Sequence, residues 1–178
     1  MSDEFKSGFA GRATAVFTPL WTAALLMLVV AVANAGGLKG KVVGVMDGDT
    51  IDVLTAEKSL HRIRLEGIDA PEKRQPFGQA AKGALSDAVF AREVKVVWHK
   101  QDRYQRIIGK VLVDADDVGL ALVRSGYAWH YKRYETEQTP VDRITYASAE
   151  LLARGRGRGL WTDSYAQAPW DFRASRRK

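Results

Sequence analysis

The stretch 39-KGKVVGVMDGDTIDVLT-55 decides how this chain folds. Two runs rich in valine and isoleucine flank an Asp47-Gly48 pair, and Asp-Gly is a preferred sequence for a tight turn between antiparallel strands. The stretch therefore predicts a β-hairpin. Turn chemistry explains Asp47, but it does not explain Asp49, which follows the glycine and enters the second strand together with Asp52.

Beyond the hairpin, three segments alternate as strands do and three have the periodicity of amphipathic helices. The strands are expected at residues 59–68, 93–102 and 106–114, and the helices at 77–92, 117–127 and 139–155. Gly126 falls at a common C-cap position, and Pro140 falls near a helix start. Five short strands with a helix between the third and the fourth are typical of an OB-type barrel. We therefore expect an α+β, mainly β fold, namely a five-stranded OB-fold barrel with about three helices.

The first 35 residues have a different composition from the rest. Lys6 and Arg12 precede a run of fourteen mostly apolar residues, 20–33, which is short for a membrane span of roughly 20 residues. Ala33-Asn34-Ala35 follows, a small-x-small pattern at which signal peptidase cuts. The sequence predicts a signal peptide over 1–35, cleaved near Ala35, and a secreted or periplasmic protein. The alternative is an uncleaved membrane anchor with the domain facing outward.

The remaining chain is expected to hold one domain over 38–163 and a basic tail over 164–178 with a disordered end. The 178 residues include no cysteine, which excludes disulfides, thiolate metal sites and a cysteine nucleophile. A net charge of +6 and a pI of about 9.6 favour anionic partners such as nucleic acid, acidic lipid or phosphorylated substrates. The histidines lack metal-ligand spacing and are interpreted as strand or surface residues; they are His61, His99 and His130.

A second informative stretch is 62-RIRLEGIDAPEKRQPFGQ-79, where Asp69 and Glu72 gather around a proline. Asp49 and Asp69 lie at the ends of strands that can be neighbours, and two carboxylates held together repel unless a cation joins them. Oxygen ligands without cysteine or histidine favour Ca²⁺ or Mg²⁺ over zinc. This group of carboxylates is therefore either part of a metal site or part of a solvated loop.

Arg64 and Arg106 are candidates for a phosphate clamp, because a guanidinium presents a planar fork that matches two phosphate oxygens. The alternative is a pair of solvated strand arginines. Arg64 and Asp69 are an odd number of positions apart, so a straight strand would point them to opposite faces. They can share a site only if the backbone bends between them, and Gly67 is the expected place for the bend.

The motifs VMDGDTIDV, IRLEGIDAPE, DRYQR and GLW resemble, in order and spacing, those of the thermonuclease family, the micrococcal or staphylococcal nuclease-like proteins. The resemblance covers Lys39 to Trp161, and PWDFR at 169–173 is similar to the tail of bacterial members. DGDT and R-x-x-x-x-D-x-P-E together are quite specific. The resemblance implies an OB-fold enzyme that uses Ca²⁺ to hydrolyse DNA and RNA, leaving a 5′-hydroxyl and a 3′-phosphate.

The resemblance also implies roles for individual residues. Asp49 and Asp69 fall on direct metal ligands, Ala70 on a ligand that uses only its backbone carbonyl, and Asp47 on an acid near the ion. Glu72 falls on the glutamate that orients, or also deprotonates, the attacking water. The two phosphate-binding arginines of the family correspond to Arg64 and Arg106.

Substrate contacts are implied as well. Arg103 and Tyr104 fall on the basic and aromatic pair beside the nucleotide, and Tyr131 or Tyr134 supplies a further aromatic contact. Gln105 stands where many members have glycine, and the segment 73–79 is shorter than the loop of the best-known member.

The expected function is a monomeric, secreted, Ca²⁺-dependent nuclease with little sequence preference and no stable protein partner. One alternative is a catalytically silent module on the same barrel that binds nucleic acid or protein. A more distant one is a membrane-anchored adhesin that uses the basic tail.

Overall fold

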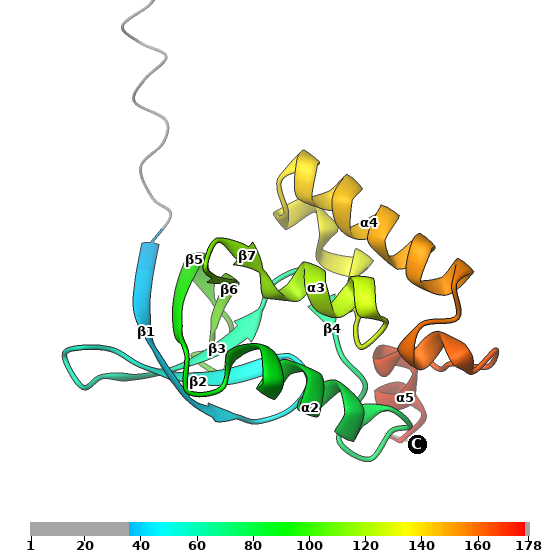
Figure 1. The fold of residues 1–178 in the computed structure, drawn as a ribbon, viewed down its shortest axis with the longest axis horizontal. Helices are drawn as coiled ribbons and strands as arrows, with labels where there is room; N and C mark the ends of the chain where they lie inside the picture. Colours follow the sequence, from blue (N-terminus) through cyan, green and yellow to red (C-terminus); the bar gives the residue numbers. More distant parts are fainter. Residues whose placement is uncertain (1–35, 177–178) are drawn as a thin grey trace, which may run out of the picture. The chain divides into compact units, whose positions relative to one another are not determined.

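The computed structural model describes residues 36–176, so the predicted signal segment over 1–35 lies outside the described residues (Figure 1). Strands β1 (Gly36–Val45) and β2 (Thr50–Leu54) are antiparallel, and the Met46 N–H donates to the Thr50 carbonyl at 2.9 Å across the turn. The hairpin predicted from Asp47-Gly48 is confirmed. Among residues 36–176, none of the helices combines the length and apolar character that a membrane span requires.

A closed five-stranded barrel forms the centre of the domain (Figure 1). Its other strands are β3 (Leu60–Leu65), β5 (Glu93–Gln101) and β6 (Ile107–Val113), and the sheet order is β3-β2-β1-β5-β6. Parallel pairing of β3 with β6, in which Ile63 lies opposite Ile107, closes the barrel. The expected OB-fold architecture is confirmed.

Alternation along the strands builds the core of the barrel, because every second side chain of a strand faces inward. In β6 the odd-numbered residues from Ile107 to Val113 are buried and the even-numbered ones are half-buried. Helix α2 (Gly78–Val89), between β3 and β5 in the chain, places Ala81, Leu85 and Val89 into the same core. The short strands β4 (Ile68–Asp69), β7 (Asp116–Asp117) and β8 (Trp129–His130) complete the β-structure of the described residues.

Helices α3 (Val118–Ser125) and α4 (Pro140–Gly155) have the ends that the sequence predicts. Gly126 adopts the left-handed conformation at φ 76° after α3, and Pro140 occupies the first turn of α4 behind the capping Thr139. Two 3₁₀ segments, η1 (Lys132–Glu137) and η2 (Gly159–Thr162), precede and follow α4.

The C-terminal segment differs from the expected tail. Helix α5 (Pro169–Ser175) includes Arg173, Ala174 and Ser175, which were expected to begin a disordered end. A second apolar cluster explains the helix, since the Trp129 ring contacts Trp161 at 4.3 Å and Trp170 of α5 at 5.5 Å between centroids. Aromatic burial thus holds α5 against the domain.

The three histidines lie in strands, as interpreted, in β3, β5 and β8. His130 is also fully buried, and its Nε2 lies 2.8 Å from Oε1 of Gln138. Its role in the structure is therefore internal packing.

Candidate active site

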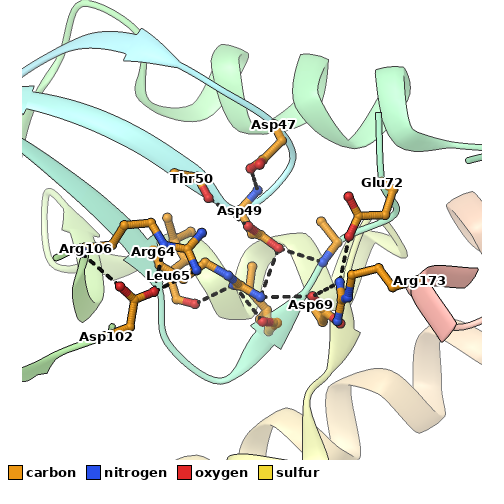
Figure 2. A network of polar contacts seen from close by, with 12 residues as sticks. Asp47, Asp49, Thr50, Arg64, Leu65, Asp69, Glu72, Asp102, Arg106 and Arg173 are labelled. Atoms are coloured by element: carbon orange, nitrogen blue, oxygen red, sulfur yellow. Dashed lines mark hydrogen bonds and ion pairs between the residues drawn. The ribbon is translucent and has the colours of Figure 1, made fainter. Parts of the chain in front are cut away.

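Two buried aspartates meet at one arginine in the structure (Figure 2). Asp49 comes from the end of the β1–β2 turn and Asp69 from β4, and their exposed fractions are only 6% and 1%. The Nη2 atom of Arg64 lies 3.2 Å from Oδ2 of Asp49 and 2.9 Å from Oδ1 of Asp69. The structure therefore brings together three residues that the sequence analysis assigned to the site.

A bend at Gly67 makes this meeting possible. Strand β3 ends at Leu65, Gly67 has φ 75°, and β4 starts at Ile68. The Arg64 guanidinium folds over the bend and donates from Nη1 to the carbonyls of Leu65 at 3.0 Å and Ile68 at 2.9 Å. The predicted bend is confirmed, and it turns Arg64 and Asp69 toward the same place despite their odd separation.

Asp47 and Ala70 frame the Asp49 carboxylate. Asp49 Oδ2 accepts from the Ala70 N–H at 3.0 Å, its Oδ1 accepts from the Thr50 hydroxyl at 3.0 Å, and the Asp49 N–H donates to Asp47 at 3.1 Å. Burial, and then the negative charge of Asp49, raise the pKa of Asp47 to about 6. Negative charge is thus concentrated in a place with little water.

The acidic cluster suits a hard cation. Among residues 36–176, no three His, Cys, Asp or Glu side chains gather as a metal-binding group, so protein carboxylates would provide only part of a coordination shell. Ca²⁺ accepts carboxylate, backbone carbonyl and water oxygens together. Burial raises the pKa of Asp69, and its hydrogen bond to Arg173 and the charge of Arg64 oppose this rise. The donor set therefore fits calcium.

Glu72 follows β4 in a turn whose backbone is fixed. Its carbonyl accepts from the Gln75 N–H at 2.8 Å, and its N–H donates to Oε1 of Gln75 at 3.1 Å. Gly78 packs against the same carbonyl so closely that a Cβ there would lie 2.0 Å from the oxygen. The Glu72 side chain is 39% exposed, so water can reach a carboxylate whose backbone is held still.

Arg173 of α5 is the site residue that the sequence analysis missed. Its Nη1 donates to Oε1 of Glu72 at 2.7 Å and its Nη2 donates to Oδ2 of Asp69 at 2.8 Å (Figure 2). Burial opposes the charge, but the hydrogen bonds to Asp69 and Glu72 prevail and raise the pKa of Arg173 above its usual range. The only signal in the sequence was the PWDFR motif, which ends on this arginine.

Arg106 directly precedes β6. This strand runs beside β3, which carries Arg64, since Arg64 pairs with Ile108. Its Nε donates to Oδ2 of Asp102 at 2.8 Å, so in this structure its partner is Asp102 and not the acidic cluster. Gln105 has φ 63°, a conformation that glycine adopts more easily, which explains why glycine suits this position.

The other expected substrate contacts are Arg103 and three tyrosines, Tyr104, Tyr131 and Tyr134. Tyr104 is 65% exposed, and the Arg103 guanidinium lies 4.9 Å from its ring centroid. Tyr131 stacks on Trp170 at 5.4 Å, with 14° between the ring planes, and Tyr134 meets Tyr131 edge-on. A cavity of about 300 Å³ opens here, lined by Trp129, Tyr131, Lys132, Arg133, Arg154 and Trp170.

The cavity lies next to the acidic cluster in the fold. Trp129 in β8 lines the cavity, and its backbone pairs with that of Asp69 in β4. Of the two tyrosines, Tyr131 lines the cavity.

Comparisons with known proteins agree with this geometry. Residues 62–163 match the sequence profile described as "Staphylococcal nuclease homologue". The chain is 42% identical over 160 residues to Protein ParB of Escherichia coli, covering 85% of this chain and 88% of that protein. It is 38% identical over 160 residues to a micrococcal nuclease of Shigella flexneri, covering 85% and 89%. An uncharacterized endonuclease of Escherichia coli is 40% identical over 137 residues, covering 76% and 85%. These matches support a nuclease function, and the chain belongs to the staphylococcal nuclease homologue family.

Proposed function

We propose that this chain is a Ca²⁺-dependent phosphodiesterase that cleaves DNA and RNA with little sequence preference and leaves 3′-phosphate ends. The observation that carries the proposal is the convergence of Asp49 and Asp69 on Arg64, with Glu72 joined to Asp69 through Arg173. This arrangement combines cation ligands, a phosphate-binding fork and a water-accessible acid.

The cation would be held by the carboxylates of Asp49 and Asp69 and the carbonyl of Ala70, with Asp47 as a nearby acid. When bound, calcium supplies positive charge that stabilises the negative charge developing on the phosphate. Asp49 is oriented for this role by Thr50 and the Ala70 N–H, which each donate to a different carboxylate oxygen.

The protein's own residues would carry out the transfer. Glu72 holds a water molecule and accepts its proton while the water oxygen attacks phosphorus. The bond from phosphorus to the 5′-oxygen breaks, and this oxygen takes up a proton from solvent water to become a 5′-hydroxyl, so the phosphate stays on the 3′ side. Arg64, oriented by the carbonyls of Leu65 and Ile68, donates to the phosphate oxygens as their charge grows.

Arg106 is the second phosphate contact in this proposal. Its guanidinium leaves Asp102 and binds a phosphate of the substrate. Each arginine recognises the backbone and not the base edges, which accounts for broad specificity. The exposed Tyr104 and the cavity at Tyr131 offer aromatic surfaces on which bases of any sequence stack. The net charge of +6 favours binding of both DNA and RNA. The protein is proposed to act as a monomer.

The alternative is a catalytically silent module that binds nucleic acid or protein. Both aspartates, Glu72 and both arginines are present, which favours catalysis over this alternative. The decisive experiment incubates the purified chain from Gly36 onward with plasmid DNA in Ca²⁺ and then in EGTA. Cleavage with calcium that stops with EGTA is the expected result, and binding without cleavage in calcium would select the alternative.

We also propose that the protein acts outside the cytoplasm, in the periplasm or the medium. The support is the pattern of positive charge, apolar run and Ala33-Asn34-Ala35 in the sequence. The same pattern would also suit an uncleaved membrane anchor, with the domain facing outward.

A further inference from the structure

Arg173 joins Asp69, a proposed cation ligand, to Glu72, the acid proposed to hold the attacking water. Its Nη2 donates to Oδ2 of Asp69 at 2.8 Å, and its Nη1 donates to Oε1 of Glu72 at 2.7 Å and to Oδ1 of Asp69 at 3.2 Å. The guanidinium therefore spans from a cation ligand to the water-holding acid. Figure 2 shows Arg173 reaching both acids from helix α5.

The position of Arg173 is fixed by packing on several sides. Trp170, three residues earlier and therefore on the same face of α5, packs edge-on against Trp129. The backbone leading into α5 is tied to the turn that carries Glu72, because the Gln75 amide donates to the Gln167 carbonyl at 2.6 Å. Helix α5 and the Glu72 turn are thus held together by a contact independent of Arg173.

The Glu72 side chain needs such a contact. Its backbone is fixed, but a glutamate has three side-chain torsions, and this side chain is 39% exposed. Among residues 36–176, the charged group that contacts its carboxylate is the Arg173 guanidinium. Arg173 makes two hydrogen bonds to Asp69 and one to Glu72, so its planar fork fixes the Glu72 carboxylate relative to Asp69, which a single point charge cannot do.

We propose that Arg173 is a positioning residue whose guanidinium holds the Glu72 carboxylate beside Asp69, where it aligns the attacking water. The inference rests on the proposed hydrolytic function. It also has a consequence for cation binding, because a positive charge beside Asp69 repels a second positive charge. Removing Arg173 should therefore slow the reaction and, at the same time, tighten calcium binding.

Three variants of the chain from Gly36 onward test this: Arg173→Gln, Arg173→Lys, and Arg176→Gln as the matched control. Arg176 lies at the end of the same helix and places its guanidinium 5.6 Å from the Phe172 ring centroid. For each variant the measurements are the melting temperature, the calcium Kd by calorimetry, and kcat and KM on single-stranded DNA.

Arg173→Gln should lower kcat by about 10- to 100-fold, since a misplaced reacting group costs this much, with little change in KM. Its calcium Kd should fall by about three- to tenfold, because the repelling charge is gone. Arg173→Lys keeps the charge but loses the fork, so its calcium Kd should stay near the parent's while kcat still falls. Arg176→Gln should match the parent in all measurements.

A purely structural role would lower the melting temperature and weaken calcium binding together, and this result would overturn the inference. Parent-like kcat in Arg173→Gln would also overturn it. If the parent itself does not cleave DNA in calcium, the proposed function fails instead. The calcium Kd of Arg173→Gln then still shows whether Arg173 shares its carboxylate with the cation.

Discussion

The Asp49 carboxylate accepts a hydrogen bond from the backbone N–H of Ala70 at 3.0 Å, which links the β1–β2 turn to the segment after β4. The two segments lie twenty-one residues apart in the chain. Ala70 is also the residue whose carbonyl is expected to face the cation. A side-chain ligand and a backbone ligand of the proposed site are therefore connected before any cation binds.

Asp49→Asn should weaken calcium binding as well as turnover, because it removes the charge of a direct ligand. The expected change is at least about tenfold in the calcium Kd, measured by calorimetry. Asp52→Asn is the matched control, since Asp52 lies in β2, the strand that follows Asp49, and pairs with Arg62 at 2.8 Å. Equal calcium affinities for the two variants would remove Asp49 from the proposed ligands.

Glu72→Gln should reduce kcat by about 10²–10⁴-fold, because the amide keeps the shape of the side chain but is a far weaker base. The melting temperature should change little, since this exposed side chain is not part of the core. DNA binding should persist, because both arginines remain. The measurements are kcat on single-stranded DNA and thermal melting, with Glu57→Gln in the β2–β3 turn as control. Cleavage at the parent rate would show that Glu72 has no catalytic role.

Gly67→Ala should destabilise the fold by about 1–3 kcal/mol, because alanine is strained at φ 75° and its Cβ would lie 2.2 Å from Nε2 of Gln138. The same change should displace Asp69 from Arg64 and lower activity further than stability alone explains. Gly83→Ala is the opposite control. Gly83 lies inside α2 with nothing within 4 Å of an added Cβ, so alanine should stabilise the protein by about 0.5–1 kcal/mol. Chemical denaturation measures both values, and a shared sign would contradict the account of the bend.

Binding to nucleic acid should weaken steeply with salt and similarly for unrelated sequences, if phosphate contacts dominate. In a Glu72→Gln background, Arg103→Ala should lower the slope of log K against log salt by about 1. Arg92→Ala, which removes an arginine paired with Asp114, should leave the slope unchanged. A salt-independent, sequence-selective affinity would argue for base readout instead.

Export predicts a mature N-terminus near Gly36, where β1 begins. N-terminal sequencing of the protein recovered from the periplasm or the medium checks this. Recovery of chains that begin at Met1 from the membrane fraction would support the anchor.

The sequence was sufficient to predict the barrel, because its signals are local. Asp47-Gly48 marks the hairpin, and alternation in β6 marks the core. Even the bend at Gly67 followed from counting positions, since Arg64 and Asp69 can meet only if the strand breaks. Where a residue's neighbours in the chain determine its conformation, the sequence is enough to predict it.

The contacts of Arg173 could not be predicted in this way. Arg173 meets Asp69 and Glu72 in a fold where Trp170 packs on Trp129 and Gln75 bonds to Gln167, and sequence periodicity does not reveal contacts between such distant segments. Its basic surroundings suggested a disordered tail instead. The pairing of Arg106 with Asp102 was missed for another reason: the two residues are only four positions apart, but the resemblance directed attention to phosphate binding and not to this local ion pair.

The position of Arg173 in the chain also has a consequence for biosynthesis. A ribosome makes Asp49, Asp69 and Glu72 first, and the helix that carries Arg173 follows only after the barrel strands and α4. A chain interrupted before α5 has the acids of the site without the arginine that joins two of them. The complete arrangement therefore arises only once translation has passed residue 173, and partial chains released earlier lack it.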